Sequence, residues 1–121
     1  MKKYQLQSND LSTSLVFYRA LFNHMPEEIG PDRLRFETPQ LQLSITEARV
    51  PAIPTYPFSL HVNEKDLVEV YGRMRRFTTK QRFREQCEEL NGAIGLTDPD
   101  GNQWIIGDEQ REVEFEKCYI N

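Results

Sequence analysis

Few side chains in this 121-residue chain have the chemistry of a metal ligand or a catalytic group. The sequence contains two histidines, and His61 lies within an alternating segment that is typical of a strand. Imidazole nitrogen binds divalent metals or hydrogen-bonds a ligand. A lone histidine is a weak indication of a metal, so we expect His61 to line a binding surface. Metal binding at His61, with Gln7 opposite it and Gln5 or Gln103 nearby, is the alternative.

The two cysteines, Cys87 and Cys118, do not predict a disulfide framework or a nucleophile. They lie far apart in the sequence, and the glutamates that surround Cys87 disfavour its thiolate form. Those glutamates, and the acidic residues of the C-terminal tail, are typical of solvated surfaces. No catalytic residue is therefore predicted.

The elements that would position these residues occur in two copies. Tyr4–Gln7 alternates apolar and polar residues as a half-buried strand does, and Phe58–Asn63 repeats the pattern. A helix is predicted after each copy, with Asn9 or Asp10 as the first N-cap and Asn63 as the second. Three further strands are predicted in each copy: near Glu27–Ile29, at Arg33–Thr38 and Leu41–Thr46, and at about Phe83–Leu90, Ala93–Thr97 and Gln103–Ile106.

The chain is thus predicted to be one α+β domain of two βαβββ modules, because internal repetition determines architecture more firmly than any single element. Module one spans about 1–47, a proline-rich linker about 48–57, module two about 58–107 and a tail 108–121. Pairing of the modules would give a curved, eight-stranded mixed sheet with the helices on its convex side.

The residues that alternate with the apolar ones are predicted to line the concave side. Burial of the apolar residues against the helices is the main driving force, and Phe36 and Trp104 belong to that buried set. The opposite set is rich in amides and hydroxyls. Tyr56, at the mouth beside the linker, is a further candidate, with turn packing as its alternative role. The predicted ligand-binding group therefore comprises His61, Arg35, Gln5, Gln7, Ser44, Ser59, Gln103 and Tyr56.

Composition excludes some classes of function. A net charge of −4 argues against a nucleic-acid partner, which normally meets a basic face. Mean hydropathy is −0.66 and no apolar run is long enough to span a bilayer, so no membrane partner is expected. The N-terminus has no apolar signal-peptide core, which predicts a cytoplasmic address with reduced thiols.

Three motifs, in order, resemble the vicinal oxygen chelate superfamily of glyoxalases, bleomycin-resistance proteins and dioxygenases. They are Asn9-Asp10-Leu11 with Phe17–Phe22, then Phe36–Leu41, then Asp98–Trp104, and the last is similar to the small glyoxalase-like proteins. The resemblance implies a paired-module fold and a homodimer, which is sometimes domain-swapped. The superfamily includes catalytic members and also members that bind a drug without a catalytic metal.

The resemblance also implies where a metal would be bound. Catalytic members carry His, Glu or Gln at four strand positions, which correspond here to Lys3, Ser44, Pro57 and Ile105. Lysine, proline and isoleucine lack a usable lone pair, and serine is a weak ligand. No cofactor is therefore predicted, and a divalent metal at His61 remains the alternative.

These observations order three functions. The first is a metal-independent small-molecule binder, whose ligand would be anionic or amide-rich because Lys3, Arg33 and Arg35 belong to the lining. The second is a non-catalytic interaction module that uses the acidic tail and the arginine-rich end of the second helix. The third is a metal-dependent lyase, isomerase or dioxygenase centred on His61.

Overall fold

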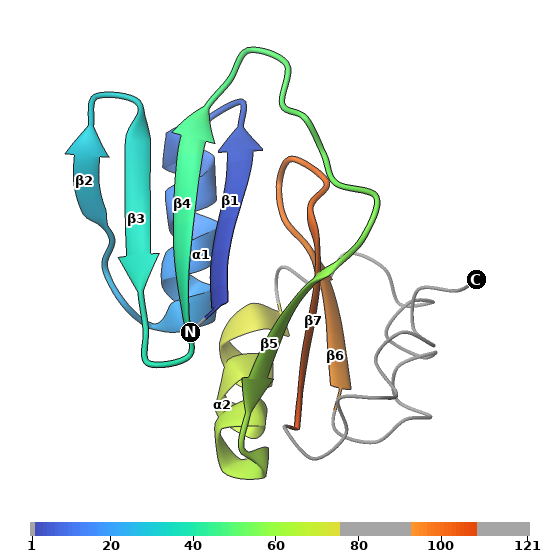
Figure 1. Ribbon diagram of the computed structural model, residues 1–121. Coiled ribbons are helices and arrows are strands. Elements are labelled where there is room, and N and C mark those ends of the chain that lie inside the picture. The colour runs from blue at the N-terminus through green and yellow to red at the C-terminus, as the bar shows by residue number, and fades with distance from the viewer. Residues whose placement is uncertain (1, 76–92, 109–121) are drawn as a thin grey trace. The chain divides into compact units, whose positions relative to one another are not determined.

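The structure, a computed structural model, describes residues 2–75 and 93–108. The chain divides into two compact units (Figure 1). Unit 1 comprises the residues up to Thr55 together with Asp98–Asn102, and unit 2 comprises Tyr56–Thr97 and the residues from Gln103 onward. No helix within the described ranges is long and apolar enough to cross a membrane.

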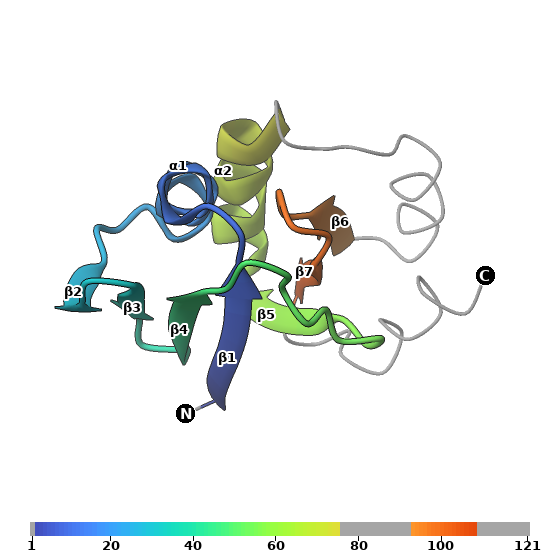
Figure 2. The same ribbon diagram turned by 90° about the horizontal axis from the view of Figure 1, so that it is seen from above.

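Unit 1 contains the first βαβββ module. Its four-stranded sheet has the order β1-β4-β3-β2, in which β1 pairs parallel with β4 and the other pairs are antiparallel. Helix α1 covers one face of this sheet, as the view from above shows (Figure 2). The elements are β1 (Lys2–Ser8), α1 (Leu11–Phe22), β2 (Glu27–Gly30), β3 (Arg33–Glu37) and β4 (Leu41–Glu47).

Local signals set the ends of α1. Asp10 is the N-cap, and its Oδ1 accepts a hydrogen bond of 3.0 Å from the Ser12 amide. Asn23 ends the helix with φ of 51°, in the left-handed region that asparagine tolerates better than most residues. Asp10 was one of the two N-caps that the sequence predicted for this helix.

Helical spacing of apolar residues in the sequence predicts a buried stripe of Leu11, Leu15, Tyr18, Leu21 and Phe22, and the buried face of α1 differs from it. Tyr18 and Leu21 are buried, but Leu11, Leu15 and Phe22 are only half-buried. Phe17 and the polar Ser14 complete the buried face instead. Ser14 tolerates burial because its Oγ lies 2.6 Å from Ser8 Oγ, which gives the hydroxyl a hydrogen-bond partner.

Unit 2 repeats the pattern in its described part. The parallel pairing of β5 with β7 matches that of β1 with β4, and β6 pairs antiparallel with β7. Asn63 caps α2, because its Oδ1 accepts a 2.8 Å hydrogen bond from the Asp66 amide. The elements are β5 (Phe58–Val62), α2 (Glu64–Met74), β6 (Ala93–Thr97) and β7 (Gln103–Asp108).

The described strands therefore form one four-stranded and one three-stranded sheet. The predicted strand at about Phe83–Leu90, both cysteines and the acidic tail lie outside the described residues.

Each unit has an aromatic core on the helix-facing side of its sheet. In unit 1, Phe36 is fully buried, with its ring centroid 6.2 Å from Tyr18 and 5.4 Å from Phe22. In unit 2, Trp104 is fully buried and its ring centroid lies 5.1 Å from Phe58. The prediction that Phe36 and Trp104 are core residues is confirmed.

Candidate functional site

The opposite face of the unit 1 sheet carries three rows of polar side chains. Strand register places Gln5 beside Ser44 and Ser44 beside Arg35, so three predicted ligand-binding residues form the central row. Side chains of neighbouring strands in one row lie about 5 Å apart. We call the following set the polar face: the row Gln7–Thr46–Arg33, the central row Gln5–Ser44–Arg35, and the row Lys3–Gln42–Glu37.

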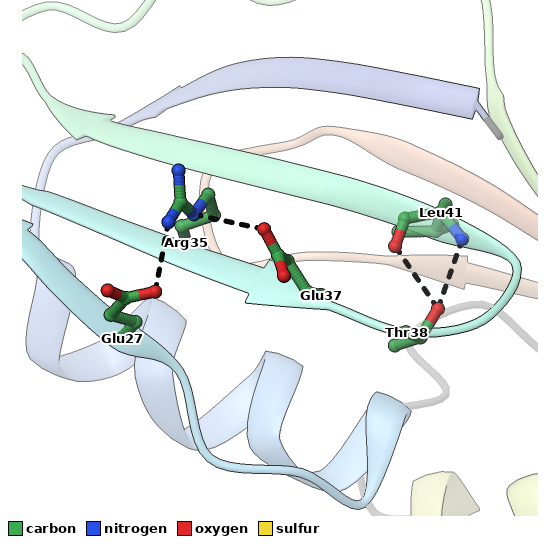
Figure 3. Close-up of polar contacts among 5 residues, drawn as sticks. All are labelled: Glu27, Arg35, Glu37, Thr38 and Leu41. Carbon is green, nitrogen blue, oxygen red and sulfur yellow. Dashed lines mark hydrogen bonds and ion pairs between the residues drawn. The ribbon is translucent and has the colours of Figure 1, made fainter.

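Two glutamates hold Arg35 in the central row (Figure 3). Its Nη2 donates a 3.0 Å hydrogen bond to Glu27 Oε2, and its Nε lies 3.4 Å from Glu37 Oε1. The hydrogen bond and charge of Glu27, assisted by Glu37, raise the pKa of the guanidinium above its ordinary value. Two carboxylates therefore offset the positive charge of Arg35, one of the three cations that the sequence assigned to the lining.

The ion pairs of Arg35 were not predicted from the sequence, although the sequence indicates one of them. Glu37 follows Arg35 by two positions, and alternate residues of a strand share a face. The role of Glu27 is evident only from the register of β2 against β3, in which Glu27 lies opposite Arg35.

The hairpin between β3 and β4 is closed by Thr38, whose Oγ1 accepts a hydrogen bond from Leu41 N at 3.1 Å (Figure 3).

Gln7, at one end of the polar face, holds the linker. Its Oε1 accepts a 2.8 Å hydrogen bond from the Ala52 amide. The Asn9 amide group donates to the Arg49 carbonyl at 2.7 Å, and Ala48 N donates to Ser8 O at 2.8 Å. The side-chain oxygen of Gln7 is thus engaged within the protein, which leaves ligand contact to its Nε2.

The corresponding face of unit 2 contains both polar and apolar residues. His61 and Ser59 lie on it and are half-buried, and the Nε2 atom of His61 is buried. The row of Ser59 contains Ile105 and Gly95, which are both buried, and the row of His61 contains Gly107. The described strand neighbours of Ser59 and His61 in these two rows are therefore small or apolar residues.

Two residues of unit 2 that were predicted to bind the ligand, Gln103 and Tyr56, lie away from His61. The register of β5 against β7 places Gln103 beside the residue that precedes Phe58. That residue is four positions before His61, which corresponds to about 13 Å along a strand. Tyr56 is 64% exposed, and its ring meets Phe58 edge-on at a centroid distance of 6.4 Å. The structure thus places Ser59 and His61 together and leaves Gln103 at the other end of the face.

The donor set does not fit the divalent metal that the resemblance implies. Ser44 lies beside an amide and a guanidinium, Lys3 is exposed, and Ile105 is a buried hydrocarbon. Within residues 2–75 and 93–108, no three His, Cys, Asp or Glu side chains are grouped so that they would hold a metal ion. A hydroxyl flanked by a guanidinium is a poor ligand for a cation.

A second polar cluster of unit 1 is buried under α1 and serves the fold. The Asp98 carboxylate accepts four hydrogen bonds, from the Tyr18 hydroxyl at 2.5 Å, the Asn102 side chain at 2.9 Å, and the amides of Asp100 and Asn102 at 2.9 and 2.8 Å. Ser14 Oγ donates to Asp100 Oδ2 at 3.3 Å. From the sequence, this segment was used only as part of the Asp98–Trp104 motif, and the buried network was not predicted.

The buried position of Asp98 predicts a pH dependence of stability. Burial raises the pKa of this carboxyl above its ordinary value of 3.8, and the hydrogen bonds from Tyr18 and Asn102 lower it without cancelling the rise. The folded protein then binds this proton more tightly than the unfolded chain does. The stability that Asp98 contributes is full below the unfolded pKa and is lost as pH rises through the folded pKa.

Urea unfolding of the wild type and Asp98→Asn, from about pH 3 to pH 7, tests this sign. The free energy of unfolding of the wild type, relative to the variant, should fall as pH rises. A relative stability that increases with pH would mean that the four hydrogen bonds outweigh burial.

No family model and no curated protein matches the sequence. Solved structures match most of it. A glyoxalase/bleomycin resistance protein from Albidiferax ferrireducens T118 is 16% identical, with 88% of this chain and 95% of that chain covered and a TM-score of 0.64. The fosfomycin resistance protein FosX from Listeria monocytogenes is 14% identical, with 94% of each chain covered and a TM-score of 0.70.

A bleomycin-binding protein, solved in complex with bleomycin, is 19% identical, with 90% of this chain and 98% of that chain covered and a TM-score of 0.61. At these identities the likeness concerns the fold alone. The chain has the glyoxalase/bleomycin-resistance fold.

Proposed function

We propose that this chain is a small-molecule-binding protein that uses the polar face and needs no metal. The observation that carries the proposal is the central row, in which an amide, a hydroxyl and a guanidinium follow one another across three adjacent strands. These groups donate and accept hydrogen bonds, and they offer no ligand set to a cation. The ligand is expected to be rich in amides or to carry an anionic group.

The solved neighbours support the general class. One of them was solved in complex with bleomycin, and a mutant of FosX was solved in complex with Mn(II) and 1S,2S-dihydroxypropylphosphonic acid, so this fold accommodates small-molecule complexes. The donors of the present chain favour a complex without a metal. His61, Ser59 and Gln103 of unit 2 remain in the proposed ligand-binding group. The protein is also proposed to be a cytoplasmic homodimer.

The proposal is tested by native mass spectrometry of the purified chain, with and without added Ni²⁺, Zn²⁺, Mn²⁺ and Fe²⁺. A dimer that retains no metal is expected, and any additional small mass would identify the ligand class. One metal per chain that is lost in His61→Ala would contradict metal independence and would favour an enzyme of this superfamily.

Binding itself is tested by replacing the centre of the polar face. Titration calorimetry of N-acetylated amino-acid amides and simple carboxylates against the wild type identifies a probe. Ser44→Leu places four carbons between Gln5 and Arg35, and it should weaken binding of that probe at least about tenfold by removing a hydrogen bond and blocking the row. Ser12→Leu, on the exposed surface of α1, is the matched control. Equal binding by both variants would exclude the polar face.

A further inference from the structure

We infer that the ligand is an amphiphilic anion, bound at the end of the polar face where Arg33 and the apolar linker residues Val50 and Ile53 lie. This inference rests on the proposed function, since it names the chemistry of the same face. Of the three cations that the sequence assigned to the lining, Lys3, Arg33 and Arg35, it selects Arg33 for the anionic contact.

The charge argument begins with what Arg35 contacts. Its guanidinium is bound by Glu27 and Glu37, and an incoming anion would have to compete with two carboxylates. Arg33 lies on the same face, is exposed, and forms no ion pair within the described part of the chain. Because Glu27 and Glu37 are engaged by Arg35, Arg33 is the arginine of this face that can bind a carboxylate, sulfonate or phosphonate with two hydrogen bonds, which the ammonium of Lys3 does not offer as a planar pair.

The apolar argument comes from the linker. Val50 is 84% exposed and Ile53 is 38% exposed, so both offer apolar surface to a ligand. The backbone between them is held, because Arg49 O accepts from Asn9 Nδ2 and Ala52 N donates to Gln7 Oε1. Pro51 and Pro54 restrict its backbone further. An apolar surface that is already ordered binds at a lower entropic cost.

Gln7 connects the two arguments. Its side chain lies on the polar face and touches the linker at Ala52, while strand register places Thr46 beside it and Arg33 beside Thr46. Two strand spacings separate Gln7 from Arg33, which is about 10 Å. An aromatic or branched aliphatic anion of one or two rings spans this interval, with its charge at Arg33 and its hydrocarbon against the linker.

Three probes separate charge from hydrocarbon: naphthalene-1-sulfonate has both, 2-naphthol has only the rings, and sulfate has only the charge. Calorimetric titration of the full chain should show naphthalene-1-sulfonate binding about tenfold more tightly than either of the others. Arg33→Gln should weaken its binding about tenfold without affecting 2-naphthol. Ile53→Ser should weaken both aromatic probes severalfold by removing apolar contact area.

Matched controls lie away from the face. Arg19→Gln removes an exposed arginine from the last turn of α1, and Val68→Ser removes a valine of α2 that is 69% exposed. Both should bind naphthalene-1-sulfonate as the wild type does. An effect of Val68→Ser equal to that of Ile53→Ser would indicate nonspecific adsorption and would overturn the inference.

Failure of this inference is distinct from failure of the proposed function. Suppose that Ser44→Leu abolishes binding of naphthalene-1-sulfonate while Arg33→Gln and Ile53→Ser bind it as the wild type does. The polar face then binds ligands, but the proposed site for an amphiphilic anion is wrong. If the wild type binds amides but not naphthalene-1-sulfonate, the same conclusion follows. If neither probe class binds, both proposals fail.

Discussion

Asp98→Ala is expected to lower the free energy of unfolding by about 3–5 kcal/mol, because one carboxylate satisfies several buried donors. Asp98 is only 4% exposed and accepts from the Tyr18 hydroxyl, the Asn102 side chain and two backbone amides. Alanine would leave these donors buried without their acceptor. Since a domain of this size is stable by about 5–15 kcal/mol in total, the variant would be close to its unfolding threshold. Urea unfolding followed by circular dichroism measures the change.

Two further variants identify the cause. Tyr18→Phe removes one donor and leaves the carboxylate with three, so it should cost about 1.5–3 kcal/mol. Asp10→Ala removes an exposed N-cap carboxylate from the same unit and should cost about 1 kcal/mol. A loss for Asp98→Ala no larger than that for Asp10→Ala would show that the buried network contributes little beyond the turn.

Trp104→Ala is expected to destabilise the protein by about 3–5 kcal/mol, through lost burial and the cavity left behind. The side chain is fully buried and packs on Phe58 in unit 2. Because Trp104 is the one tryptophan of the chain, unfolding of the wild type can be followed by its fluorescence and that of the variant by circular dichroism.

Tyr56→Ala is the comparison for Trp104→Ala. It removes a second aromatic side chain near Phe58, but one that is largely exposed, and the loss should remain below about 1 kcal/mol. Trp104→Phe keeps most of the buried area and should destabilise the protein less than Trp104→Ala does. An equal loss of stability for the two variants would contradict the contribution of aromatic burial.

Much of the fold is local information that the sequence contains by itself. Alternation with a period of two assigned Gln5, Ser44 and Arg35 to one face and Phe36 and Trp104 to the other, because successive side chains of a strand point to opposite sides. Asp10 and Asn63 were identifiable as caps, because a short polar side chain beside a helix start satisfies a local amide. The internal repeat then indicated two equivalent modules.

The tertiary structure decided which residues of a face meet. Pairing of β2 with β3 brought Glu27 to Arg35 and offset the charge that the sequence had assigned to a ligand. A hydrogen bond from a linker amide engaged Gln7, and another joined Tyr18 to Asp98, residues far apart in the chain. These outcomes depend on register and on contacts between distant segments. Side-chain periodicity assigns a residue to a face, but it does not determine which residue lies opposite.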